Sequence, residues 1–179
     1  MARNFMCTKT DPVVETKAGK LRGFQLDGTY VFHGVKYADA KRFHQPTPVE
    51  PWEGIKNALA YGYVCPMLQQ DQPSNELMVP HRYWPLDENC QYLNIWTQHL
   101  DPNAKKPVLV WLHGGGFAAG SSIEHIAYEG ENMSKYGDVV VISLNHRLNI
   151  LGYLDLSPFG EEYKNSGNAG NADMVAALQ

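Results

Sequence analysis

Two continuous apolar runs dominate the hydrophobic pattern in the second half of the chain. PVLVWLH at 107–113 and DVVVISLNHRL at 138–148 are long enough for strands. Such runs are typical of strands that are buried on both faces of a parallel sheet. The segment between them, 122–137, contains helix formers and ends at Gly137, a plausible helix C-cap. This strand–helix–strand order predicts a right-handed βαβ unit.

The first half of the chain shows shorter runs. Residues 12–25 alternate around Ala18–Gly19, which predicts a β-hairpin. TYVFHGVKYA at 29–38 and QYLNIWT at 91–97 predict further strands, because both are rich in aromatic and β-branched residues.

The remaining segments carry few strand or helix signals. Proline and polar residues crowd 38–58, which predicts a surface loop. Residues 66–89 contain four prolines and little periodicity, and we expect a long ordered loop there.

The last stretch, NAGNADMVAALQ, predicts a helix with Asn171 as its N-cap and Asp173 in the first turn. No glycine or charged last turn ends this helix before Gln179. We therefore expect the helix to continue in polypeptide beyond the printed sequence.

Composition and charge narrow the class of protein. The chain has 179 residues, 44% of them hydrophobic and 19% charged, which suits one globular domain. Its net charge is −4 and the charges are scattered, so neither nucleic acid nor an anionic membrane is an expected partner. No apolar stretch approaches the ~20 residues that span a bilayer. The start lacks the apolar core of a signal peptide, which favours a cytoplasmic chain and leaves open one whose signal was removed.

Cys7, Cys65 and Cys90 do not form a disulfide scaffold, and no cysteine or histidine pair has zinc spacing. Three buried or unreactive thiols are the expected reading in a chain without an export signal. A bridge between Cys65 and Cys90 remains an alternative.

Three consecutive glycines follow the first apolar run, in HGGGFAAGSS at 113–122. A tight turn would need positive φ at one of them. Phosphate binding is disfavoured, because neither GxGxxG nor GxxxxGK[ST] is present. The third explanation is an oxyanion hole, in which backbone N–H groups approach the oxygen that becomes negative in acyl transfer. Glycines permit that approach, and this is the interpretation we favour.

His113 precedes the glycines at the end of the apolar run. A catalytic base has to reach the nucleophile, and the end of this strand points elsewhere. We expect His113 to hold the shape of the loop through hydrogen bonds.

Several strings together resemble the carboxylesterase type B family, which includes the cholinesterases and the bacterial para-nitrobenzyl esterases. They are GKLRGF, DENCQYLNIW, KPVLVWLHGGGFAAGSS, GDVVVISLNHRLNILGYLDL and GNAGNADMVAALQ. The early segment FHGVKYADAKRFHQPTPVEPWEG is also similar to the N-terminal region of the family, shortened between Ala38 and Arg42. The resemblance covers nearly the whole chain, in order.

The resemblance implies an α/β-hydrolase fold, with a mostly parallel sheet, flanking helices and a Ser–His–acid triad. Gly115 and Gly116 match the oxyanion donors of the family, and Gly114 precedes them. Cys65 and Cys90 match a pair that forms a disulfide in the secreted members. No metal or organic cofactor is implied, because this chemistry needs only protein groups.

Trp84 lies upstream of DENC, where cholinesterases carry a tryptophan that binds a choline cation. Its spacing to Cys90 is shorter than in the family, and HRYWPL does not resemble the surrounding motif. We therefore interpret Trp84 as an ordinary loop aromatic and do not predict a cholinesterase.

The sequence contains no GxSxG elbow: Glu124 follows Ser121 and Ser122 where a glycine is needed, and Lys164 stands before Ser166. We expect residues 1–179 to be the N-terminal portion of a single catalytic domain that stops before the nucleophile elbow. The full-length protein would hydrolyse small-molecule carboxylic esters. The chain alone would be inactive, and its partner would be the remainder of the same protein, which carries the triad.

Two alternatives remain open at this point. One is part of a non-catalytic cholinesterase-like protein for binding or adhesion, because the family also contains members without the nucleophile. The other is a free-standing small binding domain. The intact HGGGF at 113–117 favours catalysis over the first alternative. The second would require the helix expected at the end of the sequence to stop naturally at Gln179, which we do not expect.

Overall fold

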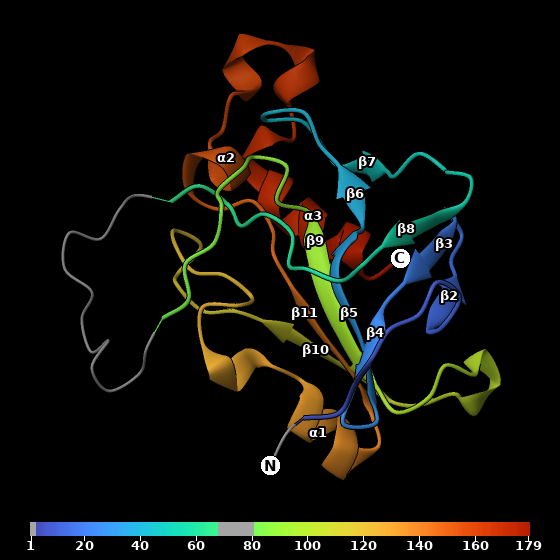
Figure 1. Ribbon diagram of the computed structural model, residues 1–179. Helices are drawn as coiled ribbons and strands as arrows, with labels where there is room; N and C mark the ends of the chain where they lie inside the picture. Colours follow the sequence, from blue (N-terminus) through green and yellow to red (C-terminus); the bar gives the residue numbers. More distant parts are fainter. Residues whose placement is uncertain (1–2, 68–80) are drawn as a thin grey trace.

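The computed structural model describes residues 3–67 and 81–179. A six-stranded mixed sheet runs through it, with the strand order β1-β4-β5-β9-β11-β10 (Figure 1). In that order the strands are β1 Phe5–Met6, β4 Phe24–Leu26, β5 Thr29–Lys36, β9 Tyr92–Thr97, β11 Val140–Leu144 and β10 Val108–Leu112. Among the neighbouring pairs of this sheet, β10 and β11 are parallel and the rest are antiparallel. In this six-stranded sheet, the parallel character expected from the sequence is thus confined to one pair of the described strands.

Two smaller sheets lie beside the large one. Their strands are β2 Val13–Glu15, β3 Lys20–Arg22 and β8 Ile55–Asn57 in one, and β6 Ala38–Asp39 and β7 Thr47–Pro48 in the other. β2 and β3 pair antiparallel about Ala18–Gly19, which confirms the hairpin. The interpretation of 38–58 as one surface loop is wrong at β6, β7 and β8. These strands have only two or three residues each, which is too few to show an alternating hydrophobic pattern in the sequence. They are held by backbone pairing with their neighbours.

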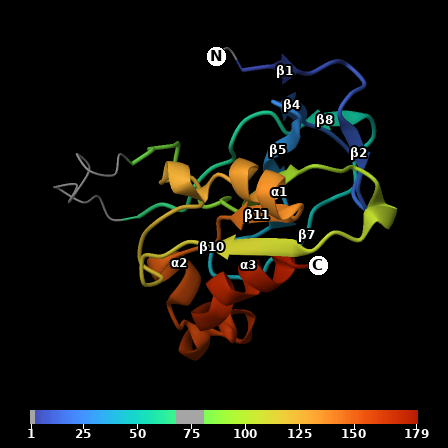
Figure 2. The same cartoon turned by 90° about the horizontal axis from the view of Figure 1, so that it is seen from below.

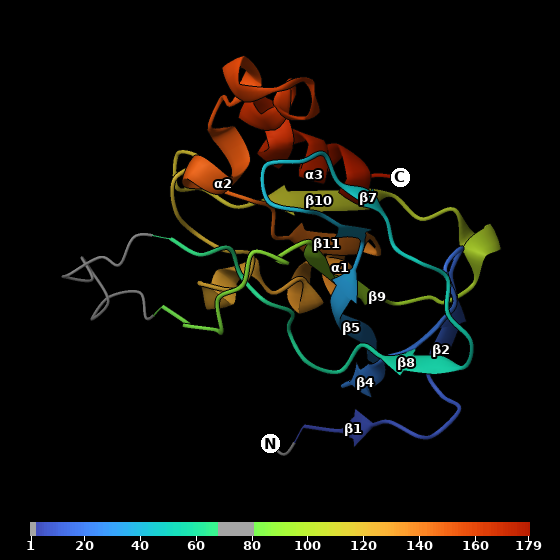
Figure 3. The same cartoon turned by 90° about the horizontal axis from the view of Figure 1, so that it is seen from above.

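The helices are short. They are α1 Glu131–Gly137, α2 Asn149–Tyr153 and α3 Ala169–Ala177, with 3-10 turns η1 Pro102–Ala104, η2 Ile126–Tyr128, η3 Ser157–Phe159, η4 Glu161–Tyr163 and η5 Ser166–Asn168. α1 and α3 lie on opposite sides of the β10–β11 pair (Figures 2 and 3). No helix among the described residues has the length and apolar character needed to cross a membrane.

The β10–α1–β11 unit confirms the predicted strand–helix–strand pattern. Val108 pairs with Val140 and Leu112 with Leu144, so the two strands run parallel and end together. The helix covers only the last part of the expected segment, and Gly137 is its last residue rather than its cap. The left-handed position belongs to Asp138, at φ 50°. Aspartate tolerates this conformation, and its carboxylate pairs with Lys106 and with His99 at 3.2 Å.

The core of the sheet lies around β5 and β9. Val31 packs in a cluster with Phe24, Trp96 and Val141, whereas its neighbour Phe32 packs in another with Leu21 and Ala58. Successive residues of a strand point to opposite faces, so β5 contributes to both clusters. Full burial of each large apolar side chain contributes about 1.5–3 kcal/mol.

β10 departs from the expectation that it is buried on both faces. It is an edge strand of the sheet, paired with β11 on one side only among the described residues. Val108, Trp111 and Leu112 are 57%, 41% and 51% exposed. The apolar run correctly predicts a strand at 108–112. Burial of both its faces would need a second neighbouring strand and further packing, which the described residues do not supply.

The long loop predicted at 66–89 is only partly covered, because residues 68–80 lie outside the described residues. On either side of that gap, Val64 and Leu86 form an isolated parallel bridge. The two flanks of the segment therefore lie side by side.

A buried ion pair joins α3 to the residues that follow β11. The side chains of Arg147 and Asp173 are 2% and 0% exposed. Arg147 Nε donates to Asp173 Oδ2 at 2.8 Å and Nη2 donates to Oδ1 at 2.7 Å, so the contact is bidentate. The Arg147 backbone N–H also donates to Oδ2, at 3.0 Å.

α3 begins at Ala169 with Asn168 as its N-cap, so the prediction of Asn171 at that position is wrong. Asp173 lies in the second turn and acts through Arg147, not through the helix dipole.

The remaining donors of Arg147 fasten a distant segment. Nη1 donates to the carbonyl oxygens of Lys41 at 3.2 Å and His44 at 2.7 Å, and Nη2 also donates to Ala169 O at 3.4 Å. The guanidinium therefore ties together the end of β11, the start of α3 and the 41–44 segment.

Replacing one partner of this pair should destabilise the protein strongly. We expect Asp173→Asn to lower the free energy of unfolding by about 3–5 kcal/mol, because it leaves the buried Arg147 charge uncompensated. Lys164→Ala is the matched control, since Lys164 and Glu161 form an exposed ion pair at 2.6 Å whose loss should cost no more than about 1 kcal/mol. Urea unfolding of the full-length protein measures both. An Asp173→Asn loss no larger than that of the control would contradict the assignment.

Candidate active site

The parallel ends of β10 and β11 bring two histidines together. His113 follows Leu112 directly and His146 comes two residues after Leu144, at the same edge of the sheet. Their rings stack with centroids 5.0 Å apart and planes 28° apart. Ligand sites of α/β proteins lie at such carboxyl ends of parallel strands.

A cavity of about 410 Å³ opens beside this histidine stack. β10, the glycine loop, the end of β11 and α3 all contribute to its wall. The lining residues are Leu112, His113, Gly114, Gly116, Phe117, His146, Leu148, Asn171 and Met174. The wall is largely apolar, with the exposed backbone of two glycines on one side.

The glycine loop folds back on itself. Gly115 O accepts hydrogen bonds from the amides of Ala118 at 3.1 Å and Ala119 at 3.3 Å. A Cβ atom on Gly115 would lie 1.9 Å from Ala119 O, so this turn admits no side chain there. Gly115 adopts a φ of 117° and Gly116 a φ of 62°. The tight-turn explanation therefore applies at Gly115.

The amides of Gly115 and Gly116 donate to no acceptor within residues 3–67 and 81–179. Gly116 lines the cavity, and a Cβ atom built on it meets nothing within 4 Å. Two adjacent N–H groups without partners can stabilise a negative charge that develops nearby. A tight turn and a site for an anionic oxygen are thus compatible in the same loop.

Hydrogen bonds at both ends fix the position of the loop. Phe117 O accepts from Asn149 N at 2.7 Å, which fastens the loop to the start of α2. Asn145 Oδ1 accepts from Ser122 N at 2.8 Å, which fastens its exit to the residue after β11. The loop is therefore held by the same elements that form the cavity.

The two histidines are suited to a structural role. His113 Nδ1 lies 2.8 Å from Gly114 O, while its Nε2 and the Nδ1 of His146 are buried and have no hydrogen-bond partner among the residues that the structure describes. Burial lowers the pKa of His113, and burial together with the nearby His113 lowers the pKa of His146 to about 4. Both rings are therefore neutral at neutral pH. The stacked, buried position of His113 agrees with a residue that shapes the loop.

The sequence interpretation did not single out His146 or Met174, and it gave Asn171 a different role. Asn171 lies within α3, where its Nδ2 donates to Asn168 Oδ1 at 2.8 Å, and it lines the cavity. His146 could have been anticipated, because it follows the second apolar run as His113 follows the first. Asn171 and Met174 reach the cavity only because α3 packs beside the strand ends.

Ser121, Ser122 and Ser166 do not lie in a GxSxG motif, and all three are buried, with exposed fractions of 3%, 1% and 1%. Asn94 Nδ2 donates to Ser122 Oγ at 3.3 Å, and Leu156 N donates to Ser166 Oγ at 2.7 Å. These hydroxyls are not presented to the cavity.

Cys65 and Cys90 are buried thiols that contact each other, next to Leu148 and Leu151. The hydrogen bond between them lowers the pKa of Cys65 and, with burial, raises that of Cys90. Leu148 N donates to Cys65 Sγ at 3.2 Å. The two side chains are neighbours, and a disulfide between them stays a prediction.

Trp84 packs as a loop aromatic. Its Nε1 donates to Tyr61 O at 3.2 Å, and its ring lies edge-on to Tyr61 with centroids 5.5 Å apart. Its exposed fraction is 38%.

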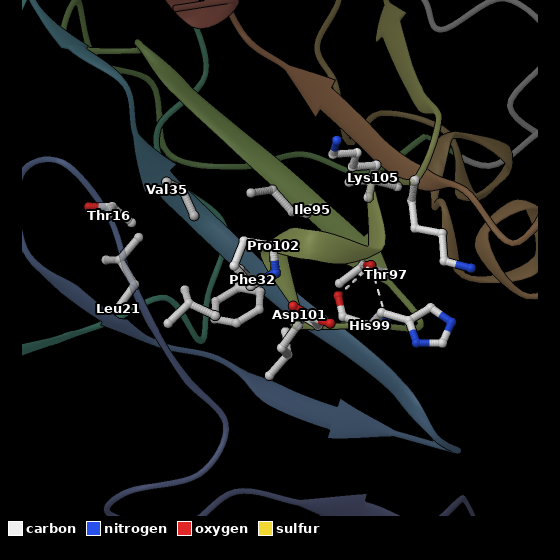
Figure 4. A pocket seen from close by; sticks show the side chains of 14 residues that line it. Thr16, Leu21, Phe32, Val35, Ile95, Thr97, His99, Asp101, Pro102 and Lys105 are labelled. Carbon is white, nitrogen blue, oxygen red and sulfur yellow. Dashed lines mark hydrogen bonds between the residues drawn. The ribbon is translucent and has the colours of Figure 1, made fainter.

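A second cavity, of about 370 Å³, lies away from the glycine loop, between the β2–β3 hairpin and residues 99–106. Figure 4 shows Leu21, Phe32, Val35 and Ile95 forming its apolar wall. Thr97 Oγ1 donates to His99 O at 3.0 Å and accepts from His99 N at 3.2 Å, so these polar groups satisfy each other. This cavity lacks the unbonded amides of the glycine loop.

The chain is similar to a known family of proteins. The family model described as the carboxylesterase family matches residues 10–179. The chain is 38% identical to the para-nitrobenzyl esterase of Bacillus subtilis (strain 168) and 39% identical to the phenmedipham hydrolase of Pseudarthrobacter oxydans, over 95% of its own length in each case. It covers 34% and 33% of those two proteins.

Solved structures show the same relation. An esterase from Clostridium hathewayi that can hydrolyse aliphatic aromatic polyesters is 66% identical, with a TM-score of 0.94 over 99% of this chain and 35% of that one. A PNB esterase is 37% identical, with a TM-score of 0.80 over 94% of this chain and 34% of that one. The chain thus spans about a third of the length of these relatives. It belongs to the carboxylesterase family and shares the α/β-hydrolase fold.

Proposed function

We propose that residues 1–179 supply the oxyanion loop of a serine carboxylesterase, as the N-terminal portion of a single catalytic domain. The observation that carries the proposal is the pair of amides on Gly115 and Gly116, which have no acceptor within the described part of the chain and lie beside an apolar cavity at the carboxyl ends of β10 and β11. Gly114 leads the chain from the strand into this loop. The Ser–His–acid triad belongs to the remainder of the protein, so the 179-residue chain by itself is inactive.

In this mechanism a serine of the remaining polypeptide attacks the ester carbonyl, and a histidine takes the serine proton and later passes it to the leaving alcohol. The carbonyl oxygen becomes an oxyanion in the tetrahedral intermediate. The N–H groups of Gly115 and Gly116 donate to that oxygen, where effective donors lie about 2.7–3.1 Å away. The neutral rings of His113 and His146 leave the stabilisation to the amide dipoles.

The exposed edge of β10 supports a partner within the same protein. Val108, Trp111 and Leu112 are apolar, and a bare apolar edge strand favours aggregation. The remainder of the protein would pair with this edge and cover these side chains. The relatives are about three times as long as the chain, which agrees with such a remainder.

The substrate class follows from the cavity and from the relatives. Leu112, Phe117, Leu148 and Met174 make an apolar wall that suits an ester with an aromatic or aliphatic group. We extend to this protein the hydrolysis of aliphatic aromatic polyesters stated for the Clostridium hathewayi esterase.

Covalent labelling tests for the triad. A fluorophosphonate probe should label the full-length protein that contains this chain, because the probe reacts with an activated serine. Chain 1–179 produced alone should take up no probe. A full-length protein that binds esters without being labelled would instead support the non-catalytic binding protein.

Substitution of Gly116 tests the oxyanion assignment. We expect Gly116→Val to lower kcat on a small para-nitrophenyl ester by a factor of about 10²–10³, the cost of losing an oxyanion donor. The reason is that the side chain would enter the open space at the cavity and hinder approach to the amides. Steady-state kinetics of the full-length enzyme measures the effect.

Gly28→Val is the matched control. Gly28 has a φ of 85° and open space around its Cβ position, in the turn between β4 and β5. Valine at position 28 introduces similar backbone strain but lies away from the cavity, so the kcat of this variant should equal that of the unchanged enzyme. Equal rates for the Gly116 and Gly28 variants would refute the assignment.

Polymer hydrolysis tests the substrate class. The full-length enzyme should release soluble aromatic acid from an aliphatic aromatic polyester film, measured by liquid chromatography. The release should fall in Gly116→Val in the same proportion as the para-nitrophenyl ester rate, because one oxyanion loop serves both reactions. Turnover of the small ester without any release from the film would limit the enzyme to small substrates.

A further inference from the structure

Two histidines from distant parts of the chain meet outside the cavity described above. The Nε2 atoms of His81 and His125 lie 3.0 Å apart. His81 begins the second described part of the chain, whereas His125 lies just before η2. Neither the oxyanion loop nor the apolar cavity uses them.

The two rings do not approach each other head-on. The ring centroids are 4.4 Å apart and the planes meet at 78°. If the two imidazole rings faced each other head-on along the line between their Nε2 atoms, the distance between their centroids would equal the N–N distance plus the distance from nitrogen to ring centre in each ring. The observed centroid separation is too small for that arrangement, so the ring axes are inclined to the line joining the nitrogens.

This inclination fits two ligands of one metal ion. Imidazole nitrogens bind first-row metals at about 2.0–2.1 Å, and two nitrogens 3.0 Å apart subtend roughly 90° at such an ion. An angle near 90° belongs to the tetragonal coordination of Cu²⁺ and Ni²⁺ by nitrogen and oxygen ligands, whereas Zn²⁺ prefers tetrahedral angles.

The surroundings hold this pair in place and favour a cation. Arg82 N donates to Glu124 O at 2.8 Å, which joins the two backbones beside the histidines. Glu124 Oε1 lies 3.9 Å from His125 Nε2, and the Tyr128 hydroxyl donates to the same oxygen at 3.4 Å. The nearby guanidinium of Arg82 pairs with Glu129, which offsets its charge. The side chains of His125 and Glu124 are 21% and 22% exposed, so solvent ions can reach them.

We propose that His81 and His125 bind a divalent transition metal ion of the Cu²⁺ or Ni²⁺ type through their Nε2 atoms. Within the described residues no group of three or more His, Cys, Asp or Glu side chains could hold a metal, so the protein supplies two ligands here. Water fills the other positions, and the Glu124 carboxylate accepts a hydrogen bond from a bound water. The ion cross-links residue 81 to the segment before η2.

Metal titration of the full-length protein tests the site. Tag-free protein stripped with a chelator is titrated with Ni²⁺ by calorimetry, and a sample with one equivalent of Cu²⁺ is measured by electron paramagnetic resonance. We expect one Ni²⁺ site and a Cu²⁺ spectrum split by two nitrogens. His81→Gln and His125→Gln should each weaken Ni²⁺ binding at least about 10-fold, since losing even a supporting partner of a ligand costs that much. Each should leave a single nitrogen in the Cu²⁺ spectrum.

His99→Gln is the matched control. His99 also stands beside a carboxylate, with Nε2 3.2 Å from Asp138 Oδ1, but its ring stacks on no other imidazole within the described residues. Its loss should leave Ni²⁺ affinity unchanged. The proposal is overturned if stripped protein binds neither ion, or if His81→Gln and His125→Gln bind Ni²⁺ as the unchanged protein does. Two variants on separate segments, each checked by its unfolding temperature without metal, distinguish a lost ligand from a lost fold.

Discussion

The contact between Arg147 and Asp173 is the constraint on which the site depends. Burying two charges costs several kcal/mol per ion, and their attraction offsets that cost only when the remaining donors are also satisfied. Here the guanidinium donates to both carboxylate oxygens and to the carbonyls of Lys41, His44 and Ala169. Because every guanidinium donor needs an acceptor, the end of β11, the start of α3 and the 41–44 segment are held together at Arg147. α3 consequently stands beside the ends of β10 and β11 and closes one wall of the cavity.

The glycine loop depends on that arrangement in turn. Its shape comes from the hydrogen bonds inside the 115–119 turn, while its position comes from Asn145, just after β11, and Asn149, at the start of α2. Among the described residues the amides of Gly115 and Gly116 have no acceptor, whereas the carbonyl of Gly115 is used within the turn. In our proposal these two donors bind the oxyanion, a group that is not part of the loop.

The bare edge of β10 and the length of the relatives lead to one physical picture. An apolar strand with one unpaired side is unfavourable in water, and the family members are about three times longer than this chain. In our proposal the same missing polypeptide covers the edge and provides the nucleophile. The two requirements would then be met together, because a strand placed beside β10 ends near the oxyanion loop.

Local signals determined much of this protein. The hairpin at 18–19, the β10–α1–β11 unit and the HGGGF loop could be read from the sequence, because turn residues and apolar runs act over a few positions. Tertiary structure alone decided the rest. Asp173 was read as a first-turn residue, and its pairing with Arg147 across 26 positions leaves no periodic trace. The stacking of His113 on His146, the edge position of β10, and the approach of His81 to His125 likewise depend on which elements pack together. The sequence gives the type of each side chain directly, whereas the burial of a side chain and its interaction partners depend on how the whole chain packs.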